Sequence, residues 1–415
     1  MALASNSALA PFRVRAFRFQ WPADLAASWA FEMETLILGW YVLTETRSVL
    51  MLTIFASLLY VGTLLSPMFG VMGDRIGHRK VLCAMRLMYA ELASVLMVAA
   101  LLGKVTPMLV LAVTALLGLV KPSDIGMRTA LVGETMPPEH LMAAMGIQRT
   151  TQDSARIAGA LSGAGLVALL GMGYAYVAVV VFYIVSVALT LKAGGERNAQ
   201  QVKTAQQATP WRDLREGMGY VWRTPHLKAT MLFAFLLNLT AFPLFTGLMP
   251  YVAKEVYGAT QTTLGTMVAS AATGSLIGSI FMSRYGNVFP PARAMLVFGA
   301  LWLAVLVVFA QTRSPAAGIP VLFFAGVMQT MGLIPISALL LRSSDQRYRG
   351  RIMGIRMMAI YGNLPGLLLA APLIANFGYA VMATIYCVFG VLATVLIALL
   401  WRDALWRREA IANRR

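Results

Sequence analysis

Long apolar runs separated by short polar turns constrain this chain more than any other feature. Six such runs, most of 20 or more residues, occur in each half of the 415-residue sequence. A helix of about 20 apolar residues is long enough to cross the hydrocarbon core of a bilayer. The composition, 59% hydrophobic and 12% charged, is typical of a membrane protein and not of a soluble domain. The predicted membrane-spanning helices cover residues 19–43, 49–72, 81–102, 107–132, 142–170, 174–191, 229–252, 259–282, 293–311, 319–341, 353–376 and 379–401.

One long polar segment divides the chain into halves of similar size. Residues 192–223 are rich in Gln and Ala and contain Pro210, which is typical of a linker. Its second part, Trp211–Trp222, has apolar residues at helical spacing and is predicted to lie along the membrane surface. We therefore expect an N-terminal bundle of six helices over residues 1–191, a linker with a surface helix over 192–228, and a C-terminal bundle with a basic tail over 229–415.

The net charge of +17 reports orientation in the membrane. If the N-terminus is inside, only four of the 34 Lys and Arg residues fall in outside loops, namely Arg47, Lys104, Lys254 and Arg313. Basic residues accumulate on the cytoplasmic side of membrane proteins. The asymmetry predicts a multi-pass protein of a bacterial-type inner membrane with both termini cytoplasmic, and it argues against a nucleic-acid partner.

The polar turn after the second span carries a recognisable motif. Residues 70–80 read G-x-x-x-D-R-x-G-x-R-K, with an acid, several basic side chains and three glycines between two apolar runs. This pattern resembles the loop 2–3 signature of the major facilitator superfamily of transporters. The resemblance implies two six-helix bundles that are related by pseudo-symmetry, and a central cavity lined by spans one, four, seven and ten.

The same resemblance implies a gating role for the motif. It suggests that Asp74 caps a facing helix and pairs with a neighbouring arginine, which stabilises one of two domain packings. Arg128 and the cluster between Arg349 and Arg356 are the candidate partners. The alternative is that Asp74 is a solvated loop acid. The predicted gating residues are Asp74, Arg75, Gly77, Arg79, Arg349 and Arg351.

The two halves look like a repeat. Ser283-Arg284-Tyr285-Gly286 follows Asp74-Arg75-Ile76-Gly77 at an offset of 209 residues, and Met353-Gly354-Ile355 follows Met145-Gly146-Ile147 at an offset of 208. Two matches at nearly one offset favour a six-plus-six duplication.

Further stretches resemble one branch of the superfamily, the enterobactin exporters and macrolide-efflux-like proteins. They are residues 131–165, 214–217 with 223–225, and 349–354. Gly159, Gly163 and Gly165 also resemble part of an antiporter motif, with Ala160 at the place of its proline. Close packing of small residues between helices is the alternative explanation of these glycines.

Acidic residues inside the predicted spans all belong to the first half, together with most of the basic ones. A charge in hydrocarbon costs several kcal/mol, so such residues mark function or an internal ion pair. On a helical wheel Lys121, Asp124 and Arg128 share one face within about 60° of arc. Glu32 and Glu34 point in nearly opposite directions, so one of them can face a cavity while the other faces a neighbouring helix. The candidate substrate- and proton-coupling residues are Glu32, Glu34, Lys121, Asp24, Asp124 and Arg128.

Two interpretations of these residues remain open. In the functional one, Glu32 or Glu34 lies close to Lys121 and binding of a charged substrate competes with protonation of the acid. In the structural one, the residues form static buried ion pairs that fix the register of the helices. Asp124 and Arg128 fit a structural or gating role, and the nearby Arg149, Asp153 and Arg156 of span five fit an internal network.

The second half offers only neutral polar residues as substrate ligands. The cavity candidates are Asn238, Gln329, Thr330 and Asn363. We find no nucleophile, phosphate-binding loop, ATP-hydrolysing domain or His/Cys cluster with metal spacing, so the sequence predicts no cofactor, no metal site and no enzyme activity.

Taken together, these features predict a monomeric secondary transporter for a small molecule that works by alternating access in the lipid bilayer. The branch resemblance implies proton-coupled export of an amphipathic molecule, such as a siderophore or a drug-like compound. Two alternatives remain open, namely proton-coupled uptake of an organic acid with Lys121 as counter-ion, and translocation of a lipid.

Overall fold

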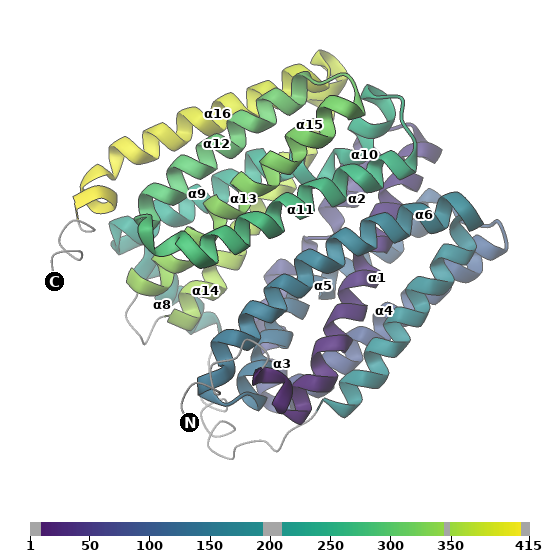
Figure 1. The fold of residues 1–415 in the computed structure, drawn as a ribbon, viewed down its shortest axis with the longest axis horizontal. Helices are drawn as coiled ribbons and strands as arrows, with labels where there is room; N and C mark the ends of the chain where they lie inside the picture. Colours follow the sequence, from purple (N-terminus) through teal and green to yellow (C-terminus); the bar gives the residue numbers. More distant parts are fainter. Residues whose placement is uncertain (1–9, 194–209, 344–348, 408–415) are drawn as a thin grey trace. The chain divides into compact units, whose positions relative to one another are not determined.

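The computed structural model describes residues 10–193, 210–343 and 349–407. These residues are almost entirely helical and include no β-strand (Figure 1). The all-α membrane fold predicted from the apolar runs is therefore confirmed. Residues 194–209 of the predicted linker and most of the basic tail lie outside this description.

The described residues form two compact units. The first unit comprises Met1–Glu45 and Val61–Pro210, and the second comprises Thr46–Tyr60 and Trp211–Arg415. The helix α2 (Val49–Leu58) therefore belongs with the second unit, where it packs against α15 (Asn363–Phe377). The units meet at Pro210 and Trp211, inside the predicted linker 192–228, and the predicted domain boundaries remain a prediction.

The helices of the first unit follow the predicted spans closely. Thr106 caps α5, because its side-chain oxygen accepts a hydrogen bond from the amide of Leu109 at 3.2 Å. The long helices of this unit are α1 (Arg15–Thr46), α3 (Ser66–Ile76), α4 (His78–Leu101), α5 (Pro107–Thr135) and α6 (Pro138–Lys192).

Two glycines with positive φ separate helices that the sequence treats as distinct spans. Gly171 has φ 81° inside α6 and divides it into the predicted fifth and sixth spans. Gly378 has φ 80° between α15 and α16 (Tyr379–Leu400), at the corresponding turn of the second unit. Other residues pay a steric cost in this backbone region, so glycine fixes both turns.

The second unit has two spans whose helices are locally irregular. Its elements are α8 (Pro210–Arg223), α9 (Pro225–Phe242), α10 (Met249–Tyr251), α11 (Gln261–Tyr285), α12 (Pro291–Gln311), α13 (Pro315–Ser343), α14 (Arg349–Met358), α15 and α16. The seventh span continues from α9 through π-helical turns at Pro243–Gly247 and Val252–Val256. The eleventh joins α14 to α15 through a 3₁₀ turn at Ala359–Gly362.

Nine helical stretches among the described residues are long and apolar enough to cross a membrane. One of them contains the break at Gly171 and provides two spans. Helix α1, whose acids lower its hydropathy, and the segment 49–76, which a 3₁₀ turn interrupts, complete the twelve spans that the sequence predicts.

Glycines allow close helix contacts within the first unit. A Cβ atom at Gly159 of α6 would lie 3.0 Å from the carbonyl oxygen of Trp29 and 2.7 Å from the Cβ of Glu32, both on α1. A Cβ at Gly163 would lie 3.1 Å from the Cα of Met33. These two glycines of the antiporter-like stretch therefore serve small-residue packing between α1 and α6.

Candidate functional site

Ionisable side chains from three helices meet inside the first unit. Asp24 of α1 forms an ion pair with Arg86 of α4, and its carboxylate lies 3.8 Å from Nε of Arg128 on α5. The amide of Gln148 on α6 donates to Asp24 Oδ2 at 3.4 Å. Asp24, Arg86 and Arg128 are all buried. Asp24 therefore lies between arginines of two neighbouring helices.

Asp124 and Arg128 form a second ion pair one turn apart on α5. Arg128 Nε lies 2.5 Å from Asp124 Oδ2, which agrees with the shared helix face. Nη1 of Arg128 also donates to the hydroxyl of Ser28 on α1 at 2.7 Å, and Gln20 donates to the Arg128 carbonyl at 3.0 Å. The arginine therefore joins α5 to α1.

The buried ion pairs balance one another in formal charge. Asp24 and Asp124 carry two negative charges, and Arg86 and Arg128 carry two positive charges. Arg86 has no exposed surface and also donates to Thr190 on the second half of α6. A buried pair that loses one member leaves an uncompensated charge, whereas these four residues together leave no net charge where α1, α4, α5 and α6 meet.

Lys121 does not take part in these ion pairs. Its ammonium lies 4.0 Å from the ring centre of Phe31 and 5.2 Å from that of Tyr89. Lys121 forms no ion pair with an acidic side chain that the structure describes. Cation–π contacts therefore stabilise the Lys121 ammonium, and no described carboxylate lies within ion-pair distance of it, although Asp124 and Glu32 interact with it at longer range.

The two glutamates of α1 have different partners. Glu32 forms an ion pair with Arg156 of α6 at 3.5 Å, and both side chains are partly exposed. Glu34 is buried and accepts a hydrogen bond of 2.9 Å from the hydroxyl of Tyr183 on α6. The opposite directions predicted for these acids agree with their different partners, but neither forms an ion pair with Lys121 in the described structure.

Two tyrosines that the sequence analysis did not single out connect Glu34 with Lys121. The ring of Tyr183 lies 5.7 Å from that of Tyr89, and Tyr89 lies beneath Lys121. Both tyrosines are fully buried. Tyrosines inside apolar spans could have been singled out from the sequence as candidate polar contacts, because a buried hydroxyl needs a hydrogen-bond partner.

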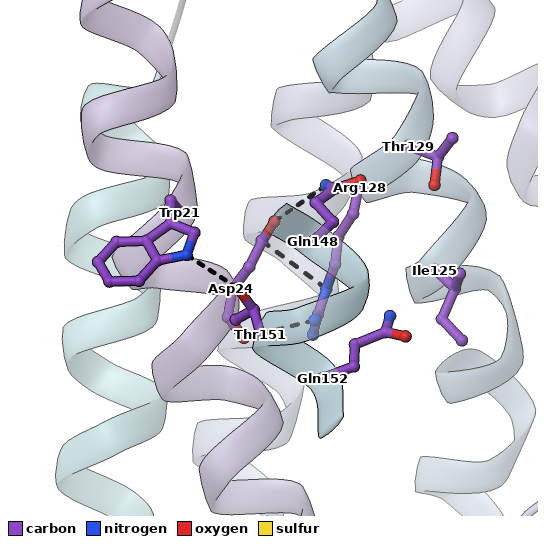
Figure 2. A pocket seen from close by; sticks show the side chains of 8 residues that line it. All are labelled: Trp21, Asp24, Ile125, Arg128, Thr129, Gln148, Thr151 and Gln152. Carbon is purple, nitrogen blue, oxygen red and sulfur yellow. Dashed lines mark hydrogen bonds and ion pairs between the residues drawn. The ribbon is translucent and has the colours of Figure 1, made fainter. Parts of the chain in front are cut away.

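A small pocket opens beside the Asp24–Arg128 contact (Figure 2). Figure 2 shows Asp24 and Arg128 directed toward each other, with Gln148 and Thr151 alongside and Thr151 bonded to the indole N–H of Trp21 at 2.8 Å. The cavity volume of about 20 Å³ holds roughly one water molecule and no organic solute. The pocket beside the ion pairs is therefore too small for a cargo molecule.

The polar residues predicted in the second half form two separate hydrogen-bonded groups in the second unit. Asn363 donates to Asn238 at 3.1 Å, which joins α15 to α9. Ser275 of α11 donates to the side-chain oxygen of Gln329 on α13 at 3.0 Å. Thr330 is buried, and its hydroxyl has no hydrogen-bond partner in the described structure.

The predicted gating residues are described only in part. Gly77 has φ 106° and ends α3 at a sharp turn, and Arg79 donates to the carbonyl of Leu191 at 3.4 Å. Arg75 is exposed. The side chains of Asp74, Arg349 and Arg351 lie outside the described part of the structure.

Two further contacts bear on the predicted networks. His78 Nδ1 lies 2.7 Å from Glu134 Oε1, a contact between α4 and α5 that the sequence did not indicate. In span five, Arg149 and Asp153 pair at 3.3 Å, as the internal network requires. Among the described residues, no group of three His, Cys, Asp or Glu side chains could hold a metal ion.

Comparison with known proteins identifies relatives by family and by fold. The family model described as Major Facilitator Superfamily matches residues 24–361 and 231–414. No curated protein matches the sequence significantly.

Solved transporter structures match almost the whole chain. The human organic anion transporter MFSD10 superimposes with a TM-score of 0.66 at 15% identity, over 93% of this chain and 99% of that one. The nucleoside transporter NupG gives 0.68 at 13% identity, over 92% and 98% of the two chains. The D-xylose-proton symporter gives 0.69 at 13% identity, over 92% and 97%. Identities this low support a common fold and no common substrate.

Proposed function

This chain belongs to the Major Facilitator Superfamily and is a membrane transporter of that type, and we propose that it exports a small amphipathic molecule with an acidic group in exchange for protons. The cargo class includes siderophores and drug-like acids. Transport works by alternating access and draws on an ion gradient. The protein acts as a monomer in a bacterial-type inner membrane, with both termini cytoplasmic.

The environment of Lys121 carries the proposal. In the first unit, Asp24 and Asp124 form ion pairs with arginines, while Lys121 contacts Phe31 and Tyr89 and forms no ion pair with a described acid. An anionic group of the cargo supplies the missing counter-ion. The aromatic rings offer apolar surface next to the ammonium, which suits a molecule that is both apolar and charged.

Glu34 is the proposed proton carrier. It forms no ion pair with a described basic side chain, whereas Glu32 is paired with Arg156. A carboxyl without a cationic partner exchanges a proton without breaking an ion pair. Its contact with Tyr183, which packs on Tyr89 beside Lys121, supports a coupling between protonation and the cargo.

Two other functions remain in competition with export. Proton-coupled uptake of an organic acid uses the same Lys121 and differs from export only in direction. Export is favoured by the branch resemblance alone. One fold relative is named as an organic anion transporter and another as a proton symporter. A lipid translocator has no specific support among the described contacts.

Comparison of secreted metabolites tests the proposal. Cells that produce the wild-type protein, Lys121→Ala, Lys104→Ala or no protein are grown in parallel, and their media are compared by untargeted mass spectrometry. Lys104 is the matched control because it is an exposed lysine in a loop. We expect acidic amphipathic compounds to accumulate outside only with wild type and Lys104→Ala.

The identified compound is then followed in proteoliposomes with and without a pH gradient. Export that needs the gradient and disappears in Glu34→Gln supports the exchange with protons. Accumulation inside the cells would establish uptake, and a neutral or cationic cargo would refute the role of Lys121.

A further inference from the structure

An apolar groove with a basic rim lies at one end of the second unit. It has a volume of about 180 Å³. Its lining comes from α8, α9, α14 and the 3₁₀ turn that follows α14. It consists of Met218, Val221, Trp222, Lys228, Met231, Leu232, Phe235, Ile355, Met358 and Ala359. Nine of these ten residues are apolar, and none is acidic.

Lys228 is the only ionisable residue in the lining. Its ammonium lies 4.8 Å from the ring centre of Trp222 and 5.9 Å from that of Trp401. Two tryptophans beside a lysine at the end of a membrane helix are typical of the interface between hydrocarbon and headgroups. Trp222 remains half exposed, so the rim of the groove is open on this side.

Helix α8 places the groove at the membrane surface. Met218, Val221 and Trp222 face the groove, whereas Arg215 and Glu216 on the same helix are exposed. A short helix with one apolar and one charged face lies in the plane of the interface. The groove therefore opens where lipid headgroups and the first carbons of the acyl chains meet.

The charges around the rim favour an anion. The described side chains on α8, α9, α14 and the turn after Trp401 include five lysines and arginines, Arg215, Arg223, Lys228, Arg356 and Arg402, against two acids, Glu216 and Asp403. The predicted orientation, with both termini inside, places this end in the cytoplasmic leaflet, which carries anionic lipids.

We propose that this groove binds one anionic phospholipid, with its phosphate beside Lys228 and part of one acyl chain against the three methionines and Phe235. Methionine side chains adapt to a flexible chain, because they are unbranched and polarisable. The volume is smaller than the roughly 300 Å³ of sites that enclose a drug-sized ligand, which favours part of an acyl chain over a whole cargo molecule. The site is independent of Lys121 and of the proposed transport direction.

Native mass spectrometry of the purified full-length protein tests the proposal. The protein is titrated with dioleoylphosphatidylglycerol, with dioleoylphosphatidylcholine and with glycerol 3-phosphate. We expect one phosphatidylglycerol to bind in preference to phosphatidylcholine, and glycerol 3-phosphate alone not to bind. Lys228→Ala should weaken the phosphatidylglycerol affinity by about fivefold, the effect of one basic residue near a headgroup.

Two further variants separate the lipid site from general effects. Met231→Trp fills the groove and should remove binding of the lipid, with folding checked by thermal unfolding. Arg284→Ala removes an exposed arginine that lies 5.9 Å from the ring of Tyr285 outside the groove, and it should leave binding unchanged. Equal binding of both lipids, unchanged affinity in Lys228→Ala, or binding of glycerol 3-phosphate alone would overturn the proposal.

Discussion

Neutralising Asp24 is the perturbation whose cost follows most directly from the ion-pair network. Asp24 is the acidic partner of Arg86, which is fully buried. The other described hydrogen bond of the Arg86 guanidinium goes to the hydroxyl of Thr190. Arg128 keeps its 2.5 Å contact with Asp124. Asp24→Asn therefore leaves one uncompensated guanidinium in the interior.

The expected cost is about 3–5 kcal/mol of folding free energy, as for other buried pairs that lose one partner. At roughly 2–4 °C per kcal/mol for a unit of this size, the unfolding midpoint should fall by about 6–20 °C. The double variant Asp24→Asn/Arg86→Gln removes both charges and should recover most of this loss, since no unpaired charge remains.

The assay is thermal unfolding of the purified protein in one detergent, followed by intrinsic fluorescence. Glu45→Gln is the matched control, because Glu45 is an exposed acid on the same helix and the substitution changes the charge equally. We expect the control to stay within about 0.5 kcal/mol of wild type. If Asp24→Asn unfolded at the temperature of the control, the ion pairs would not hold the helices in register.

Three further predictions follow from single contacts. Tyr183→Phe removes the hydrogen bond to Glu34 and should destabilise the protein by about 1–3 kcal/mol in the same unfolding assay, and a change below a few tenths would show that the bond is not formed. Gly171→Ala places a side chain on a residue with φ 81° and should lower the free energy of unfolding by about 1–2 kcal/mol. The control Gly165→Ala, where a Cβ meets open space, should be neutral or stabilising, and equal losses of stability in the two variants would contradict the role of the turn. Gly159→Leu should lower the yield of folded protein in a size-exclusion assay because α1 leaves no room for the side chain, and a normal yield would contradict the close packing of α1 and α6.

The fold was predictable because its causes are local in sequence. Apolar runs of membrane length, the glycine-rich loop at residues 70–80 and the basic asymmetry each depend on residue type and spacing. The break at Gly171 falls between the predicted fifth and sixth spans because the apolar runs end there. The membrane requires every backbone group to be bonded within a helix, so few alternatives exist.

The candidate site was predictable within a helix and not between helices. The shared face of Asp124 and Arg128 follows from the helical period and agrees with the structure. The partner of Asp24, Arg86, depends on how α1 and α4 rotate against each other, which a helical wheel does not give. For the same reason a helical wheel brings Lys121 near Glu32 and Glu34, which agrees with their electrostatic interaction in the structure, but it does not give the contacts of its ammonium with Phe31 and Tyr89.

The charge of Lys121 is the centre of this account, and ligand binding tests it most directly. The measurement is the affinity of the exported compound, and of its neutral amide, for wild type, Lys121→Ala and Lys104→Ala by isothermal titration in one detergent. We predict that the acid binds wild type and Lys104→Ala equally, and that it loses at least about tenfold in affinity with Lys121→Ala, the effect of one charge-assisted contact. The amide should bind all three proteins weakly and alike. If the acid bound Lys121→Ala as tightly as wild type, Lys121 would not recognise the cargo and the account would be contradicted.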